Sequence, residues 1–208
     1  MKRIVSEEVA LTNINSKTYA MTAITPMKPW KTPILKIFFF FLALIKPLQA
    51  RLVGLSFIHF ARWVVIKRRA FPRLADSQPE ENLSYDYLLF FSNFNGTWNQ
   101  YIDAFADVLA DGLNLVWRWS EKFPMSRPVT AFKRYISLVQ FDTDYYYTAY
   151  PRATTNDVKA AHRVCAAVED LGRNCNGMSP AEFSAAYLHF LMKVQKDLGS
   201  TGVGPVGT

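Results

Sequence analysis

Two ionisable side chains on one short apolar stretch are the first candidates for chemistry. His59 and Arg62 lie within Ser56–Ile66, which is rich in aromatic and β-branched residues and predicts a central β-strand covered on both sides. A buried guanidinium needs carboxylate or carbonyl partners, so Arg62 would clamp an anion such as a fatty-acid headgroup or form a structural ion pair. His59 would be a haem or metal ligand, a general base, or a hydrogen-bonded core residue. The carboxylates considered as partners of Arg62 are Asp86, Asp142 and Asp144.

A sharp turn and several aromatic residues could complete a ligand site beside this strand. Asn93 and Asn95 follow an apolar run, and the Asn-Gly-Thr sequence that begins at Asn95 predicts a tight turn into a helix. Trp98 and Tyr147 could line an apolar pocket for a small molecule. Turn formation, helix capping and core packing also account for all four residues, so both interpretations stay open.

Other classes of site have little support in the sequence. His162 and His189 share no ligand spacing with Cys, Asp or Glu, and neither an HExxH motif nor paired CxxC motifs occur, so no metal site is expected. The basic residues are interleaved with a Phe-rich segment, which argues against nucleic-acid binding. No catalytic residue can be assigned, and the cofactor is unknown, haem being the one candidate.

The elements that would position these residues alternate between strand and helix. A buried strand, the Asn-Gly turn and a helix capped by Thr97 and Gln100 make up residues 85–112. Two further helices are expected after Thr154 and Ser179, and strands are expected at 132–141 and 145–150. The pattern predicts an α+β domain over residues 55–198, with a ferredoxin-like antiparallel sheet and helices on one face. Residues 199–208 are expected to be a flexible tail.

The N-terminal third differs from the rest in charge. Residues 1–75 hold 13 Lys or Arg against two Glu, an excess of 11 positive charges, whereas the remainder holds 11 basic and 15 acidic residues. Residues 1–32 contain several prolines and no period, which predicts a flexible basic leader. Residues 33–50 include nine unbroken apolar residues, which predict an apolar helix that precedes the folded domain.

Three interpretations of residues 33–50 compete. The segment is shorter than the roughly 20 apolar residues that a spanning helix needs, so it fits a helix lying in the membrane interface. A buried core helix and a signal peptide cleaved after Ala50 are the alternatives. Lysines would meet anionic lipid on the cytoplasmic face, and Trp30 would sit among the headgroups. The predicted membrane contacts are Trp30, Lys36, Phe38, Phe39, Phe40, Phe41 and Lys46.

Two short motifs carry a family resemblance. Ile-His-Phe-Ala-Arg-Trp at 58–63 and Asn-Phe-Asn-Gly at 93–96 resemble a group of uncharacterised bacterial proteins over most of residues 25–170. That group is distantly similar to the dimeric α+β-barrel superfamily, which includes dye-decolourising peroxidases, chlorite dismutases and small monooxygenases. Apart from the resemblance, the strand that carries His59 and Arg62 has apolar faces, and sheets of this kind often pair through such a face, so a homodimer formed through the sheet is expected. Asn95 stands where the peroxidases have an acidic residue, which counts against peroxidase chemistry.

Two functions follow from these expectations. The first is a membrane-associated α+β protein that binds an apolar or lipid-like ligand or a partner protein. The alternative is a haem-dependent or cofactor-free oxidoreductase of the dimeric α+β-barrel type that acts near the membrane.

Overall fold

The computed structural model describes residues 12–44, 56–70 and 73–199. Within them the protein is an α+β structure with a five-stranded antiparallel sheet and six α-helices. The strands are β1 (Ile14–Asn15), β2 (Thr18–Met27), β3 (Ile58–Ile66), β4 (Asp86–Asn95) and β5 (Gln140–Phe141). The helices are α2 (Thr32–Leu44), α4 (Trp98–Val108), α5 (Ala110–Trp117), α6 (Val129–Val139), α7 (Thr155–Asn174) and α8 (Pro180–Val194), and a short 3-10 helix, η1, spans Pro29–Lys31.

Strand β2 lies in the middle of the sheet, and the prediction of a flexible leader over residues 1–32 is therefore wrong for this part. All ten of its residues pair with β4, from Thr18 opposite Asn95 to Met27 opposite Asp86. Pro26 is tolerated in β2 because its N and C=O point away from β4, on the side where the carbonyl accepts a hydrogen bond from the Glu121 N–H. The N and C=O of one residue point to the same side of a strand, so the missing N–H of Pro26 also faces away from β4.

The order of the strands is β1-β2-β4-β3, and β5 pairs with β2. Strand β3 therefore lies at an edge of the described sheet, which corrects the expectation of a central strand. The apolar helix α2 follows β2 and so does not precede the folded domain. It leads from β2 to β3 through residues 45–55, and the predicted continuation of the helix to residue 50 lies outside the described residues.

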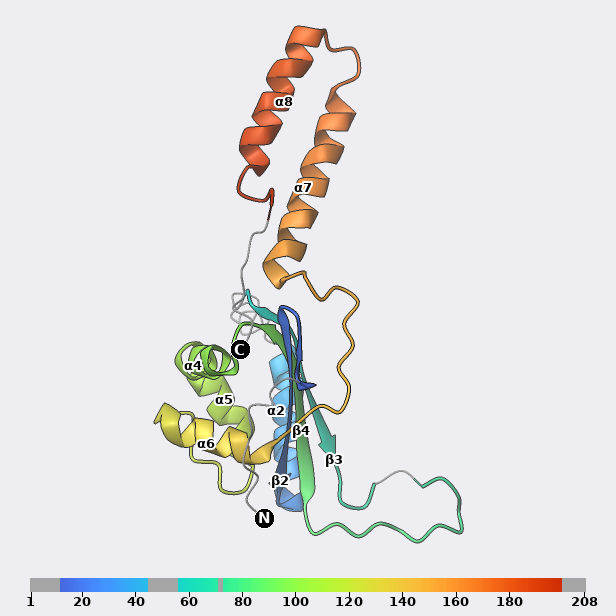
Figure 1. Ribbon diagram of the computed structural model, residues 1–208. Helices are drawn as coiled ribbons and strands as arrows, with labels where there is room; N and C mark the ends of the chain where they lie inside the picture. The colour runs from blue at the N-terminus through green and yellow to red at the C-terminus, as the bar shows by residue number, and fades with distance from the viewer. Residues whose placement is uncertain (1–11, 45–55, 71–72, 200–208) are drawn as a thin grey trace.

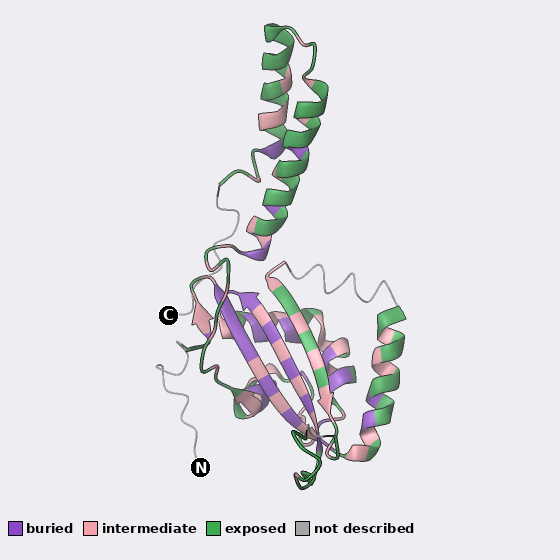
Figure 2. Cartoon of the chain, turned by 90° about the vertical axis from the view of Figure 1, so that its right-hand side faces the viewer, coloured by how far each residue is buried: buried purple, intermediate pink, exposed green. Residues whose placement is uncertain are grey.

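Helices α4, α5 and α6 cover one face of the sheet, and α2 lies beside β3 (Figures 1 and 2). Aromatic rings dominate the core between them. Phe94 of β4 stacks on Tyr101 of α4 at 3.8 Å, and Phe90 meets Trp117 of α5 edge to face at 4.9 Å. Such ring pairs add roughly 0.5–1.5 kcal/mol each beyond the burial of their area.

Helix α6 occupies a segment that was predicted as a strand, at residues 132–141. Phe132, Ile136 and Val139 recur at helical spacing, and Phe132 and Ile136 are buried on the core. Only Gln140 and Phe141 continue as the short strand β5, and residues 145–150 form no strand.

Helices α7 and α8 pack against each other as an antiparallel pair that projects beyond the end of the sheet (Figure 1). They do not lie over the face of the sheet that α4, α5 and α6 cover (Figure 1). Both predicted starts are confirmed: Thr154 with Asp157 and Ser179 with Glu182 form complete capping boxes. Arg163 of α7 pairs with Asp197 just after α8, at 2.5 Å between Nη2 and Oδ1.

Candidate functional site

Helix α2 packs one of its faces on the core. Leu35 is fully buried, and Phe38 and Phe39 are half-buried against the core residues. The ring of Phe39 lies 6.2 Å from that of Trp63 on β3. These side chains recur at positions 35, 38, 39 and 42, the spacing that places residues on one face of a helix. We refer to them as the inner face of α2.

The opposite face of α2 is equally apolar and is exposed. Its side chains are 39–64% exposed, and no polar residue interrupts them. They repeat at the same helical spacing as the inner face, shifted by half a turn. The members of this outer face are Ile34, Ile37, Phe40, Phe41 and Leu44, and Trp30 of η1 is exposed to a similar degree. A helix that is apolar all round is normally buried on all sides, so the outer face of α2 calls for a second covering.

Three lysines lie on α2 or in the short segment that leads into it. Lys28 and Lys36 are exposed, and residues 12–44 contain no acidic side chain. Lys31 is held by protein partners: its Nζ donates to Glu121 Oε1 at 2.9 Å and to the Trp119 carbonyl at 3.1 Å. The hydrogen bond from Lys31 is the main cause of a lowered pKa for the Glu121 carboxyl.

The start of α2 is fixed to the sheet by a buried carboxylate. Asp86, at the first position of β4, accepts hydrogen bonds from the Thr32 hydroxyl and from the Arg68 N–H, the latter at 2.8 Å. Asp86 and Thr32 are both almost fully buried. A buried carboxylate with two donors ties α2, β4 and the end of β3 together, so the direction in which α2 presents its outer face is set by the core.

An apolar cavity separates the inner face of α2 from α4 and α5. Its volume is about 130 Å³. Its walls include Phe38 and Leu42 of α2, Trp63 of β3, Phe105 of α4, and Leu109 and Val116 beside and within α5. Among the described residues that line it, the only ionisable side chain is Asp111, which is exposed. The break between α4 and α5 at Leu109, whose φ of −119° is not helical, lets the two helices diverge around this space.

The sheet has a second apolar surface on the side away from α4, α5 and α6, which we term the open face (Figure 2). Cross-strand rows define it, and apart from Thr22, Arg62 and Asn93 its members are apolar. Phe60 and Val64 of β3 are exposed there. The rows are Ala20–Asn93–Phe60, Thr22–Phe91–Arg62, Ile24–Leu89–Val64 and Pro26–Tyr87–Ile66.

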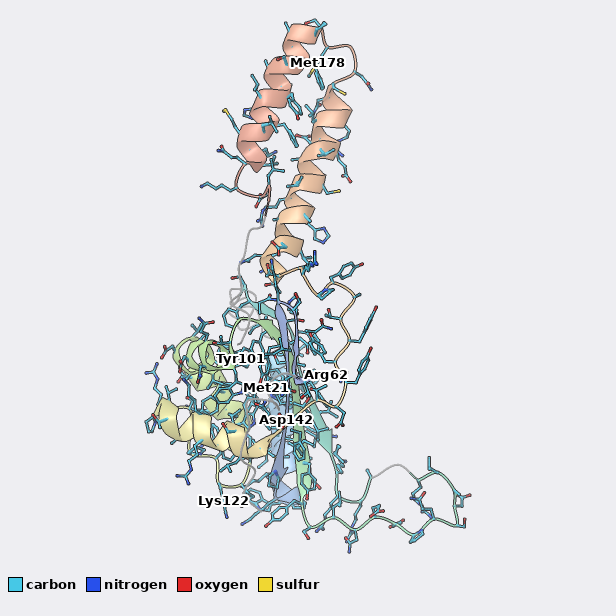
Figure 3. The ribbon with its side chains drawn as sticks, viewed as in Figure 1. Met21, Arg62, Tyr101, Lys122, Asp142 and Met178 are labelled. Carbon is cyan, nitrogen blue, oxygen red and sulfur yellow. The ribbon has the colours of Figure 1, made fainter. Side chains whose placement is uncertain are left out.

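Arg62 lies on the open face, whereas Tyr101 lies on the helix-covered side (Figure 3). Arg62 is exposed, and its Cζ lies 4.9 Å from the centre of the Phe91 ring. This is a cation–π contact between neighbouring strands. Two of the three proposed partners are engaged elsewhere: Asp86 binds Thr32 and Arg68, and Asp142 accepts from the Asn13 amide at 2.9 Å. Within the described ranges Arg62 forms no ion pair, so the expected buried pair is not present.

His59 occupies a β-bulge, which strict alternation along the strand could not foresee. Ile58 pairs with Phe94 and Phe60 with Asn93, so His59 is the extra residue without a partner on β4. Its side chain is exposed. Partial loss of hydration lowers the pKa of His59, and the nearby Asn95 amide partly offsets this. His59 does not line the cavity between α2, α4 and α5.

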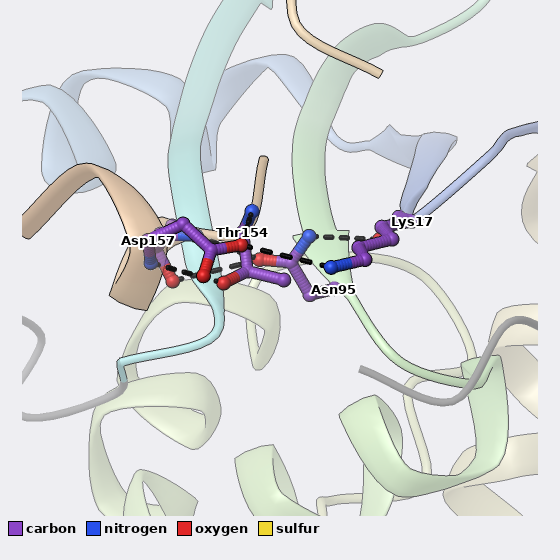
Figure 4. A network of polar contacts seen from close by, with 5 residues as sticks. Lys17, Asn95, Thr154 and Asp157 are labelled. Atoms are coloured by element: carbon purple, nitrogen blue, oxygen red, sulfur yellow. Dashed lines mark hydrogen bonds and ion pairs between the residues drawn. The ribbon is translucent and has the colours of Figure 1, made fainter. Parts of the chain in front are cut away.

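Asn95 connects three parts of the structure (Figure 4). Its Nδ2 donates to the Lys17 carbonyl at 2.7 Å, and its Oδ1 accepts from the Thr155 N–H at 3.1 Å. Lys17 also lies 3.7 Å from Asp157, the capping residue of α7. The buried Asn95 amide is thus used to join β4, the β1–β2 turn and α7.

The remaining predicted ligand residues do not gather at one place. Asn93 donates to the Tyr146 hydroxyl at 2.8 Å at the side of the open face. Trp98 packs on the core from α4 and donates to Gln140 at 2.7 Å. Tyr147 is 71% exposed. The predicted set is therefore divided between the open face, the helix-covered side and the surface.

The predicted membrane contacts divide in a similar way. Trp30, Lys36, Phe40 and Phe41 are exposed, whereas Phe38 and Phe39 belong to the inner face, and Lys46 lies outside the described residues. Prediction missed Ile34, Ile37 and Leu44 as members of the outer face. The spacing of 37, 40, 41 and 44 was the signal that could have found four of the five residues of the outer face, but an unbroken apolar run hides such a period.

Comparison with protein-family models, with curated proteins and with solved structures finds no match for this chain. In the described ranges no group of three or more His, Cys, Asp or Glu side chains could hold a metal ion. Nor is any described helix long and apolar enough to cross a membrane.

Proposed function

We propose that this protein binds the cytoplasmic surface of a membrane, with α2 lying in the interface between headgroups and acyl chains. The observation that carries the proposal is the outer face of α2, which is apolar and exposed although the inner face is already packed. The exposed Trp30 is suited to the headgroup level, and Lys28 and Lys36 are suited to anionic lipid.

The expected strength of this binding follows from the size of the outer face. Full burial of a large apolar side chain is worth about 1.5–3 kcal/mol. If interfacial contact supplies about 1 kcal/mol for each residue of the outer face, the total binding free energy is similar to that of a single myristoyl chain. A myristoyl chain binds membranes with an association constant of about 10⁴ M⁻¹, so its binding is marginal and reversible. Lysines near an anionic surface add roughly 1 kcal/mol each. Binding should therefore be reversible and should favour anionic membranes.

Vesicle flotation tests this proposal. The full chain should float with vesicles of phosphatidylcholine and phosphatidylserine more strongly than with phosphatidylcholine alone. Combining Phe40→Ser and Phe41→Ser should weaken binding at least tenfold. The matched control combines Tyr145→Ser and Tyr147→Ser, which removes two aromatic rings of even greater exposure elsewhere on the surface. Equal losses in both double variants, or no flotation of the wild type, would contradict the proposal.

We further propose that the sheet is ferredoxin-like and that its open face pairs with a second copy of the chain. The succession β2-α2-β3-β4-helices-β5, with β4 next to β2, supports the first part, and the exposed apolar rows support the second. Size-exclusion chromatography with light scattering in mild detergent should give a dimer, and Val64→Lys should give a monomer. A monomeric wild type would count against this pairing.

A further inference from the structure

The cavity between α2, α4 and α5 has the properties of a site for an alkyl group. A dry apolar cavity of roughly 150 Å³ accommodates a benzene molecule, so the volume of about 130 Å³ suits a ring or the last few carbons of a chain. Apart from Asp111 its lining is composed of apolar side chains and Gly112. Water would find few polar partners there, which favours an apolar occupant.

The cavity lies beside the same helix that carries the outer face. Phe38 and Leu42 form part of its wall, and they alternate along the same helix with Phe40, Phe41 and Leu44 of the outer face. Val108 and Leu115 also line the cavity and are 54% and 40% exposed, so the rim is apolar apart from Asp111. An alkyl chain in the layer that contacts α2 could therefore reach the cavity along the apolar side chains of Val108 and Leu115.

The charge at the cavity determines which end of an amphiphile can enter. Asp111 is exposed and lines the cavity, and its carboxylate repels a carboxylate or phosphate headgroup. Lys36, on the side of α2, offers the opposite charge outside the cavity. The methyl end is thus the end that fits.

We propose that this cavity binds the methyl end of one acyl chain of a membrane lipid, taken up next to α2. The proposal rests on the membrane-surface function for the source of the lipid, whereas the cavity and its chemistry stand on their own. A bound chain would fill the space between α2 and α5 and would hold the protein on the bilayer more strongly than the outer face alone.

Gly112 offers a position at which a side chain can be added to the cavity lining. A Cβ at Gly112 would meet no atom within 4 Å, and the residue lies inside α5 and in the cavity lining. Gly112→Leu therefore occupies the space while favouring the helix. Gly172 gives a matched control, because a Cβ there also meets no atom within 4 Å and the residue lies inside α7, away from the cavity.

The experiment uses the full chain and decanoate labelled with ¹³C at its methyl group, kept below its micelle concentration. Nuclear Overhauser effects should connect the labelled methyl to ring protons of Phe38, Phe105 or Trp63. Gly112→Leu should weaken decanoate binding at least tenfold, and Gly172→Leu should leave it unchanged. Absence of decanoate binding, contacts only to residues of the open face, or full binding by Gly112→Leu would overturn the proposal.

Vesicle flotation of the same proteins separates this proposal from the membrane proposal. Failure of decanoate binding with flotation retained refutes the acyl-chain site alone. Decanoate binding at the cavity without flotation supports the site and refutes the membrane-surface function. Bound decanoate together with flotation that is weakened in Gly112→Leu supports both.

Discussion

Helices α2 and α4 pack on the same core but differ in what they turn away from it. Helix α4 buries Tyr101, Ile102 and Phe105, and its other side carries Asn99, Gln100, Asp103 and Asp107. Asp103 is paired with Lys133 at 2.7 Å. Helix α2 buries a similar inner face but turns Ile37, Phe40, Phe41 and Leu44 outward. Water completes the environment of α4, whereas the proposed membrane contact would complete that of the outer face of α2.

The contacts of α2 with the core also fix which of its faces points outward. Asp86 and Thr32 fix its first turn, and Leu35 fixes the next one against the core. A helix held in this way cannot rotate to hide its outer face. The exposed apolar stripe is therefore a stable feature of the surface rather than a consequence of loose packing.

The largest expected effect distinguishes the two faces of α2. Leu35→Ala should lower the free energy of unfolding by about 2–5 kcal/mol, because it leaves a cavity at a fully buried position. Phe41→Ala removes more atoms but should change stability by no more than about 0.5 kcal/mol, since its ring is exposed. Urea unfolding measures both. Equal costs would show that the outer face is packed in the isolated protein.

Giving α2 the surface of α4 should remove membrane binding without unfolding the protein. Ile37→Glu combined with Phe41→Lys places opposite charges four residues apart, a pairing worth about 0.3–0.5 kcal/mol on a helix. Vesicle binding should fall more than tenfold, with circular dichroism and urea unfolding close to wild type. Retained binding would mean that the outer face of α2 is not the contact surface.

Loss of the Asp86 hydrogen bonds that fix the start of α2 should destabilise the protein less than loss of the buried Leu35 side chain. Asp86→Ala removes the acceptor of the Thr32 hydroxyl and the Arg68 N–H, and leaving buried donors unpaired costs about 1–3 kcal/mol. Thermal unfolding of the variant measures this loss. A control at the exposed Asp76 should have no measurable effect. If Asp86→Ala is as stable as wild type, another contact fixes the start of α2.

The smallest effect concerns charge beside the outer face. Lys36→Gln should weaken binding to anionic vesicles by about 1 kcal/mol, roughly fivefold, and should leave binding to neutral vesicles unchanged. Titrating salt should reduce the difference between the two proteins, because added ions screen the attraction. An equal loss on neutral vesicles would show that Lys36 acts through packing rather than charge.

Features decided within a few residues were predicted well from the sequence. The capping boxes at Thr97, Thr154 and Ser179 depend on a side chain three residues away, and all three are present in the structure. The α+β class followed from the same local patterns. Residues 132–141 were predicted as a strand, although the spacing of the buried side chains in this segment, Phe132 and Ile136, is helical.

Features decided by distant contacts could not be predicted in this way. The place of β2 in the sheet depends on its pairing with β4, more than sixty residues later in the chain. The edge position of β3 and the bulge at His59 likewise depend on how the sheet is ordered, so a site around His59 and Arg62 could not be judged from their strand alone. The cavity forms only where α2 meets α4 and α5.

Site-directed spin labelling compares α2 and α4 on the membrane and tests the central claim most directly. In a background with Cys165→Ser and Cys175→Ser, nitroxides are attached through Phe41→Cys on α2 and Asn99→Cys on α4. With anionic vesicles, the label at position 41 should become more accessible to oxygen and less accessible to a water-soluble nickel chelate. The label at position 99 should not change. Equal accessibility of both labels to nickel, with and without vesicles, would contradict membrane binding through α2.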